Sequence, residues 1–84
     1  MKYRSRTDIA YEILQAANGG STKTKIMYKA FISYAQLKEH FAMMLANDLL
    51  EFDEKTQIYK TTEKGLSFAK LYDQVSEFVS PVVQ

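Results

Sequence analysis

The sequence lacks cysteine altogether and has a single histidine in 84 residues. Without cysteine there is no disulfide framework, no thiolate zinc site and no cysteine nucleophile. No run approaches the ~18 consecutive apolar residues of a membrane span, so we expect no membrane partner. The basic first six residues lead into no apolar signal core. These absences indicate a cytoplasmic protein.

The same scarcity argues against an enzyme. One histidine allows no Ser/His/Asp set, and no carboxylate pair has a neighbour that suggests a raised pKa. His40 falls beside the apolar face of a predicted helix, where a satisfied structural role is favoured over a base or ligand. The acidic cluster between Glu51 and Glu54 can hold a cation, but a solvated hairpin loop is the better interpretation. We expect no metal and no cofactor.

The two halves of the chain differ in charge. Residues 1–40 hold seven basic and three acidic side chains, whereas residues 41–84 hold four basic and seven acidic ones. The net charge of +1 therefore hides a basic first half. Such polarity can present a basic face to phosphate, although mixed surface charge stays the simpler alternative.

Periodic apolar residues predict three helices in the first half. The first carries an apolar face and ends at Asn18-Gly19-Gly20, where glycine supplies the positive φ of a helix end. The second begins at a Ser21 or Thr22 cap and runs to about Ala30. Residues of the two apolar faces are Ile9, Ala10, Ile13, Leu14, Ala17, Ile26, Met27 and Ala30.

A capping box, in which Ser33 and Gln36 satisfy each other's backbone N–H groups, begins the third helix. Its apolar face consists of Leu37, Phe41, Met44 and Leu45. The helix ends at Asn47-Asp48, so residues 33–46 form its body. Two helices with a short turn between them, the second sharply capped, are typical of a helix-turn-helix.

The apolar period then changes. Short runs at 49–52 and 58–59 flank the polar residues 53–57, which predicts a β-hairpin. Thr61 or Thr62 can cap a fourth helix that runs to about Val79, with Pro81 beyond it as a stop. The predicted fold class is therefore α+β, mainly α.

The segment from Ile9 to Leu66 resembles the winged-helix domains of small archaeal and bacterial transcriptional regulators. It is most similar to small archaeal winged-helix DNA-binding proteins that dimerise through a C-terminal helix. The resemblance rests on the stretches 23–27, 33–37, 49–52 and 58–65, above all on Thr62-Glu63-Lys64-Gly65 after the hairpin. It implies a winged helix over residues 1–65 and a dimerisation helix with a tail over residues 66–84.

The resemblance also implies a double-stranded DNA partner, with helix 33–46 in the major groove. Gln36 can pair with adenine or serve the capping box, but not both at once. Tyr34 can contact a sugar or a phosphate of the DNA backbone, or it can pack on the second helix. Lys38 can reach guanine or phosphate. The candidate DNA-binding residues are Arg4, Arg6, Lys23, Lys25, Ser33, Tyr34, Gln36, Lys38 and Lys55.

Phosphate contacts are expected from the start of the second helix, where Lys23 and Lys25 adjoin its positive dipole end. Arg4 and Arg6 can form an arm along the DNA backbone, and a solvated tail is the alternative. Lys55 lies in the predicted wing, where Asp53 and Glu54 weaken its case.

The last helix carries an apolar seam at spacings of three and four that the small domain cannot cover. We expect Leu66 and Ala69 to pack on the domain and the seam to form a homodimer; folding back on the same domain is the alternative. The seam residues are Phe68, Leu71, Tyr72, Val75, Phe78 and Val79.

Two functions remain open. The favoured one is a dimeric, nucleoid-associated DNA-binding protein, acting as a transcriptional regulator or a chromatin-type protein. The basic first half and the polar third helix favour it. The alternative is a winged helix that binds another protein and no DNA, which the acidic wing and the modest net charge favour.

Overall fold

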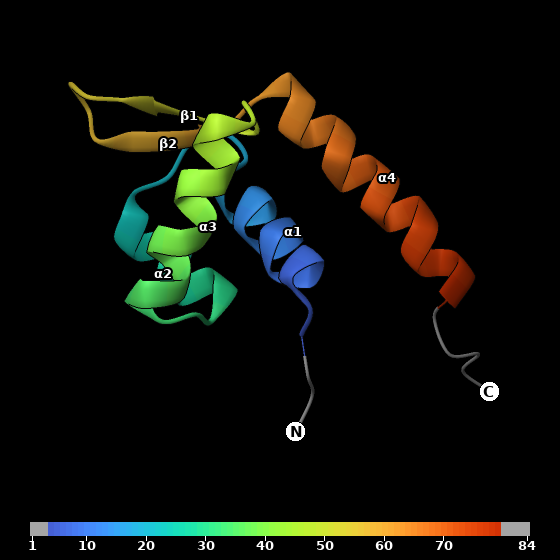
Figure 1. Ribbon diagram of the computed structural model, residues 1–84. Coiled ribbons are helices and arrows are strands. Elements are labelled where there is room, and N and C mark those ends of the chain that lie inside the picture. The colour runs from blue at the N-terminus through green and yellow to red at the C-terminus, as the bar shows by residue number, and fades with distance from the viewer. Residues whose placement is uncertain (1–3, 80–84) are drawn as a thin grey trace.

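The computed structural model describes residues 4–79 (Figure 1). The structure confirms the predicted class, with three helices, a hairpin and a long last helix. The elements are α1 Arg6–Ala17, α2 Lys23–Ala30, α3 Tyr34–Ala46, β1 Leu50–Asp53, β2 Ile58–Thr61 and α4 Glu63–Val79. Pro81, the predicted stop after the last helix, lies outside the described residues.

Side-chain caps set where the helices begin. Thr22 caps α2 by accepting from the backbone N–H of Lys25, and Ser33 and Gln36 form the predicted capping box of α3. A second capping box, which the sequence analysis missed, joins Ser5 and Asp8 at the start of α1. Each cap satisfies N–H groups that the first helical turn leaves without partners.

The turn after α1 needs glycine, as predicted. Gly19 and Gly20 have φ values of 85° and 104°, in the left-handed region that glycine enters at little cost. Beyond the turn, Ser21 and Tyr59 exchange two backbone hydrogen bonds of 2.8 Å. This bridge attaches the hairpin to the loop before α2, so Ser21 is a bridge residue and Thr22 alone is the cap.

The hairpin pairs two antiparallel strands, with Leu50 opposite Thr61 and Asp53 opposite Ile58. The ring of Tyr59 lies 4.4 Å, between centroids, from both Phe41 of α3 and Phe52 of β1. Because the Tyr59 ring contacts both α3 and β1, it fixes the position of α3 relative to the hairpin.

The core lies between the first three helices and the base of the hairpin. Residues buried there come from the predicted apolar faces, including Ile13, Leu14, Ile26, Leu37, Met44 and Leu50. Leu45 departs from the prediction because it is 39% exposed at the last turn of α3. The hydroxyl of Thr61 is buried too, and it donates a 2.7 Å hydrogen bond to the carbonyl oxygen of Leu14.

Thr62 caps α4 by accepting from the N–H of Gly65, at 3.0 Å. Gly65 is buried, and a Cβ atom there would lie 2.4 Å from the carbonyl oxygen of Leu49. Leu66, expected to pack on the domain, is instead 43% exposed, and Phe68 and Ala69 pack inward. Because Gly65 faces the hairpin, the next residue, Leu66, lies about 100° away around the helix and is exposed. From there α4 runs beside α1, and its last turns extend away from the other helices (Figure 1).

Candidate nucleic-acid interface

Three candidate residues from two helices meet at the start of α3. The ring of Tyr34 has the Nζ atoms of Lys23 and Lys38 over it, at 5.4 and 5.7 Å from its centroid. Tyr34 is 53% exposed, and both lysines are exposed. Each cation–π contact stabilises the arrangement by about 0.5–1 kcal/mol. We call Lys23, Tyr34 and Lys38 the basic-aromatic cluster.

The capping box occupies Ser33 and Gln36. The Oε1 atom of Gln36 accepts from the N–H of Ser33 at 3.0 Å, and the N–H of Gln36 donates to Oγ of Ser33 at 3.2 Å. A bidentate contact with adenine needs the amide oxygen as well as the nitrogen of the side chain. Gln36 can therefore make that contact only if this cap opens.

The surface around the cluster is strongly basic. Residues 22–46 hold four lysines and one carboxylate, that of Glu39. Oε2 of Glu39 lies 3.5 Å from Nη1 of Arg6 in a surface ion pair. Lys25 is exposed on the first turn of α2, two residues after Lys23. The four lysines therefore have no carboxylate partner among the described residues.

Arg4 does not extend as an arm in this structure. Its guanidinium donates two hydrogen bonds of 2.6 Å, one to the carbonyl oxygen of Ala30 and one to that of Phe31. These are carbonyls at the end of α2, which lack partners within the helix. Arg4 thus joins the start of the chain to the turn between α2 and α3, a contact across 26 residues that no local pattern indicates.

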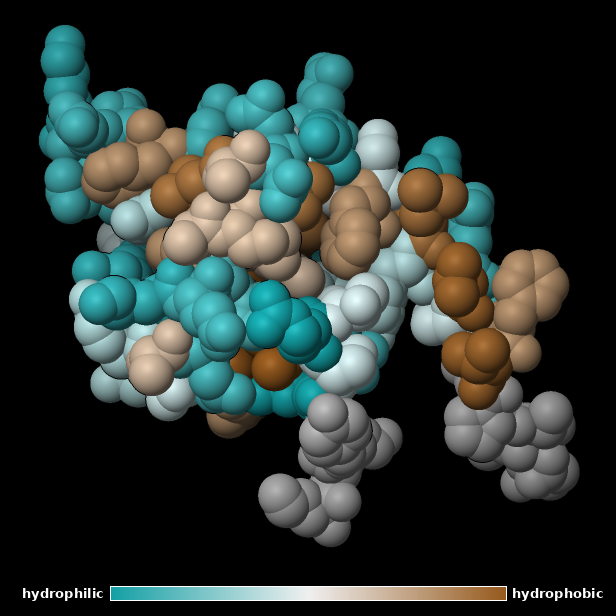
Figure 2. All heavy atoms as spheres, viewed as in Figure 1, coloured by the Kyte–Doolittle hydropathy of each residue, from teal (hydrophilic) through white to brown (hydrophobic). Residues whose placement is uncertain are grey.

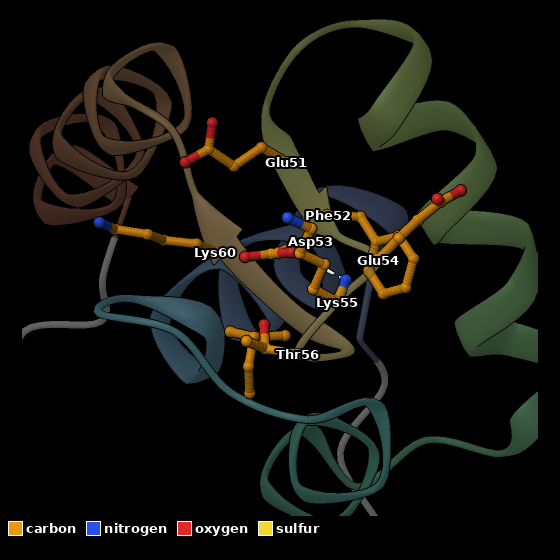
Figure 3. Close-up of a pocket in the computed structure, with 8 residues that line it drawn as sticks. Glu51, Phe52, Asp53, Glu54, Lys55, Thr56 and Lys60 are labelled. Carbon is orange, nitrogen blue, oxygen red and sulfur yellow. Dashed lines mark hydrogen bonds between the residues drawn. The ribbon is translucent and has the colours of Figure 1, made fainter.

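The hairpin carries both charges. Its outer surface surrounds an open hollow of about 730 Å³ lined by Glu51, Phe52, Asp53, Glu54, Lys55, Thr56, Ile58 and Lys60 (Figure 3). The backbone N–H of Lys55 donates to Oδ1 of Asp53 at 2.9 Å. Lys55 is exposed at the hairpin turn, close to Asp53 and Glu54. Phosphate would meet three carboxylates and two lysines here, a much less favourable field than that of α2 and α3.

A family model for the winged helix-turn-helix matches residues 3–80, nearly the whole chain. The chain belongs to the winged helix-turn-helix family. Such domains are typically non-enzymatic. No curated protein matches the sequence significantly.

A solved structure agrees with this assignment. Sso10a-2 from Sulfolobus solfataricus, described as a DNA-binding protein, is 21% identical and has a TM-score of 0.83. The match covers 89% of this chain and 81% of that one. At this identity the likeness establishes the winged-helix fold.

The α4 helix of this winged helix has two different sides. Tyr72 faces α1, where its hydroxyl donates a hydrogen bond to Oδ1 of Asp8. Phe68 packs against the core. The remaining predicted seam residues are exposed by 60% or more and recur at helical spacing: Leu71, Val75, Phe78 and Val79. We call these four residues the apolar stripe, and Figure 2 shows brown side chains following one another along the exposed side of α4.

His40 is buried, as expected for a structural histidine. Its Nδ1 atom lies 3.0 Å from the carbonyl oxygen of Gln36, whereas Nε2 has no partner within residues 4–79. The expectation of a satisfied histidine is therefore met at one nitrogen only. Within the same residues no group of three or more acidic or histidine side chains could hold a metal, and no helix is long and apolar enough to span a membrane.

Proposed function

We propose that this winged helix binds double-stranded DNA by placing the N-terminal half of α3 in the major groove. The observation that carries the proposal is the basic-aromatic cluster. It brings Lys23 from α2 and Lys38 from α3 to the exposed start of α3 over one ring. In helix-turn-helix proteins the N-terminal part of the motif's second helix, here α3, approaches the bases. The motif's first helix, here α2, crosses the DNA backbone.

The individual contacts follow from this placement. Lys38 extends from α3 toward a base edge or a phosphate, and Lys23 and Lys25 neutralise phosphates beside the start of α2. Ser33 and Tyr34 donate hydroxyl hydrogens to phosphate oxygens at the start of α3. When the protein binds DNA without sequence preference, Gln36 keeps its role in the cap of α3. It makes a bidentate contact with adenine only where that cap opens. Sso10a-2, described as a DNA-binding protein, has the same fold, which supports DNA binding by this one.

Three outlying residues have smaller roles. Arg4 acts through its two hydrogen bonds to the end of α2, which position the turn before α3. Arg6 and Lys55 are long-range phosphate contacts, because each has a carboxylate close by that weakens its attraction for an anion.

We further propose that the protein is a homodimer whose interface is formed by α4. The apolar stripe supports this, since four large apolar side chains, each exposed by 60% or more, lie on one side of one helix. In a two-fold symmetric contact these four side chains would be buried on both protomers, and the burial of their apolar surface would stabilise the dimer. Phe68 and Tyr72 border the stripe from the side of the domain and complete the proposed interface at its edge. A two-fold dimer would place its two α3 helices in successive major grooves, ~34 Å apart.

Within this proposal the cellular role is that of a nucleoid-associated regulator or chromatin-type protein. The two roles differ in sequence preference. Competition between a labelled duplex and unlabelled duplexes of varied sequence distinguishes them, because a regulator prefers one site by ~10³-fold or more whereas a general binder treats all duplexes alike.

Fluorescence anisotropy tests the binding itself. A labelled duplex of about 30 base pairs and arbitrary sequence is titrated at about 50 and about 200 mM salt, and phosphate-driven binding then weakens by orders of magnitude at the higher salt. Binding that is micromolar or tighter at low salt and lost at high salt supports the proposal. Flat curves at tens of micromolar in low salt contradict it.

The second candidate, a protein-binding winged helix, draws on one specific observation. The hairpin surface carries Glu51, Asp53 and Glu54 around its hollow, where a DNA-binding wing is usually basic. If the duplex titration is flat, a pull-down with the hairpin surface intact and with all three carboxylates changed to amides tests this candidate.

A further inference from the structure

Three aromatic residues recur at intervals of three across α2, the turn and the start of α3. Tyr28, Phe31 and Tyr34 are 71%, 83% and 53% exposed. Large aromatic side chains bury most of their surface in folded domains, so three exposed ones along a single segment are unusual. Tyr34 belongs to the basic-aromatic cluster, whereas neither Tyr28 nor Phe31 has a ring contact within residues 4–79.

The backbone holds Phe31 in an unfavourable conformation. Phe31 has φ 56° and ψ 52°, the left-handed region that glycine and asparagine enter more readily than a bulky residue. Arg4 donates to its carbonyl oxygen at 2.6 Å, and the N–H of Phe31 donates to Met27 and Tyr28. A costly backbone conformation that presents an apolar ring to water, held by an arginine from 27 residues away, is typical of a functional position.

The charge around these rings selects the kind of ligand. Lys25 and Lys29 are exposed on α2, three residues before and one residue after Tyr28, and no carboxylate lies between residues 22 and 38. A surface that combines open aromatic rings with lysines fits a nucleic-acid strand, because the bases stack on the rings and the lysines neutralise the backbone. An intact duplex offers no such stacking, since its bases are already paired and stacked on each other.

We infer that Tyr28 and Phe31 form a stacking platform for unpaired bases of DNA. This inference rests on the proposed function and extends it. The protein binds duplex DNA through the basic-aromatic cluster, and it binds more tightly where the adjoining strand is opened and an unpaired base reaches the platform. Opened or kinked sites are thereby favoured over regular duplex, whatever their sequence.

The test compares two labelled probes in the same anisotropy titration at about 100 mM salt. One is a regular duplex of about 30 base pairs, and the other carries a central loop of about four unpaired thymines. The platform is removed by Phe31→Asn together with Tyr28→Gln, since asparagine tolerates the left-handed backbone and glutamine suits a helix. Leu66→Gln is the matched control, because it removes an exposed apolar side chain from the first turn of α4.

We expect the unchanged protein to bind the looped probe about tenfold more tightly than the duplex, the gain from stacking one base. The platform variant should lose this preference and keep its duplex affinity, while Leu66→Gln should behave like the unchanged protein. Equal affinity of the unchanged protein for both probes overturns the inference, as does a preference that survives in the platform variant. The absence of duplex binding overturns the proposed function instead, and loop binding without duplex binding overturns that function while supporting the platform.

Discussion

Tyr11 of α1 and Tyr72 of α4 stack on each other, with ring centroids 4.2 Å apart and ring planes inclined by 16°. Each hydroxyl donates to a carboxylate on the opposite helix, Tyr72 to Asp8 and Tyr11 to Asp73. Asp8 also accepts from the N–H of Ser5 through its other oxygen. The contact therefore joins the cap of α1 to the middle of α4 and sets the direction in which the apolar stripe leaves the domain.

These contacts predict a pH-dependent stability. The hydrogen bond to Asp8, with burial, raises the pKa of Tyr72 to about 12. The hydrogen bond from Tyr72, with that from the N–H of Ser5, lowers the pKa of Asp8. Because the pKa of Asp8 is lowered, its ionised carboxylate stabilises the fold at pH values above the usual aspartate pKa of about 3.9. This stabilisation is lost as the pH falls through the pKa of Asp8 in the folded state. Because the pKa of Tyr72 is raised, its protonated hydroxyl stabilises the fold below about pH 10. This stabilisation is lost as the pH rises through the pKa of Tyr72 in the folded state.

Tyr72→Phe should therefore lower Tm by the largest amount between about pH 4 and pH 10, with a smaller effect on either side. Thermal unfolding followed by circular dichroism across this range measures the difference. Tyr28→Phe removes a hydroxyl from an exposed ring and should leave Tm unchanged. A Tyr72→Phe effect that is equal at pH 3 and pH 7 would show that the hydrogen bond to Asp8 does not stabilise the fold.

Gly65→Ala should destabilise the domain. The new Cβ would lie 2.4 Å from the carbonyl oxygen of Leu49 and 2.7 Å from Cγ2 of Thr61, so α4 must move away from the hairpin. We expect a loss of about 1–3 kcal/mol in the free energy of unfolding, measured with urea. The control is Gly19→Asn, where a Cβ meets nothing within 4 Å and asparagine tolerates the positive φ. Equal stability of Gly65→Ala and the unchanged protein would contradict the close approach.

Thr61→Val tests the buried hydrogen bond between the hairpin and α1. Valine keeps the shape of the side chain but leaves the carbonyl oxygen of Leu14 without its 2.7 Å donor. Because Thr61 is buried, we expect a loss of about 1–3 kcal/mol in the same urea experiment. Thr56→Val, in the exposed hairpin turn, is the matched substitution and should change little. Similar effects at both positions would argue against a specific role for the Thr61 hydroxyl.

The α4 dimer makes a prediction about mass in solution. Sedimentation equilibrium at micromolar concentration should give twice the chain mass for the unchanged protein, and Val75→Asp should give a monomer because a charge would be buried in the interface. Leu66→Asp, off the stripe, should stay dimeric. A monomeric unchanged protein at this concentration would contradict the proposed interface.

Local patterns predicted most of this structure. The Thr22 and Ser33 caps, the glycine turn and the apolar stripes are set by residues within a few positions of each other, and the helices begin where they indicated. The capping box of Ser5 and Asp8 was missed although its spacing is the same as that of Ser33 and Gln36.

The contacts that position the candidate site are of a different kind. Arg4 binds Phe31 across 27 residues, and Tyr72 binds Asp8 across 64. Gly65 rather than Leu66 packs against the hairpin, and Leu66 is exposed. Such relations arise from tertiary packing, so the sequence predicted which residues were basic or apolar but not which of them meet.

The central claim is that the start of α3 and α2 together bind DNA, and the most direct measurement is the salt dependence of duplex affinity for two charge-matched double variants. Lys23→Ala with Lys38→Ala removes the lysines over Tyr34, and Lys64→Ala with Lys70→Ala removes two exposed lysines of α4. The account predicts that the first variant binds much more weakly, with a slope of log affinity against log salt reduced by about 2, and that the second keeps the affinity and slope of the unchanged protein. Equal losses in both variants, or none in the first, would contradict it.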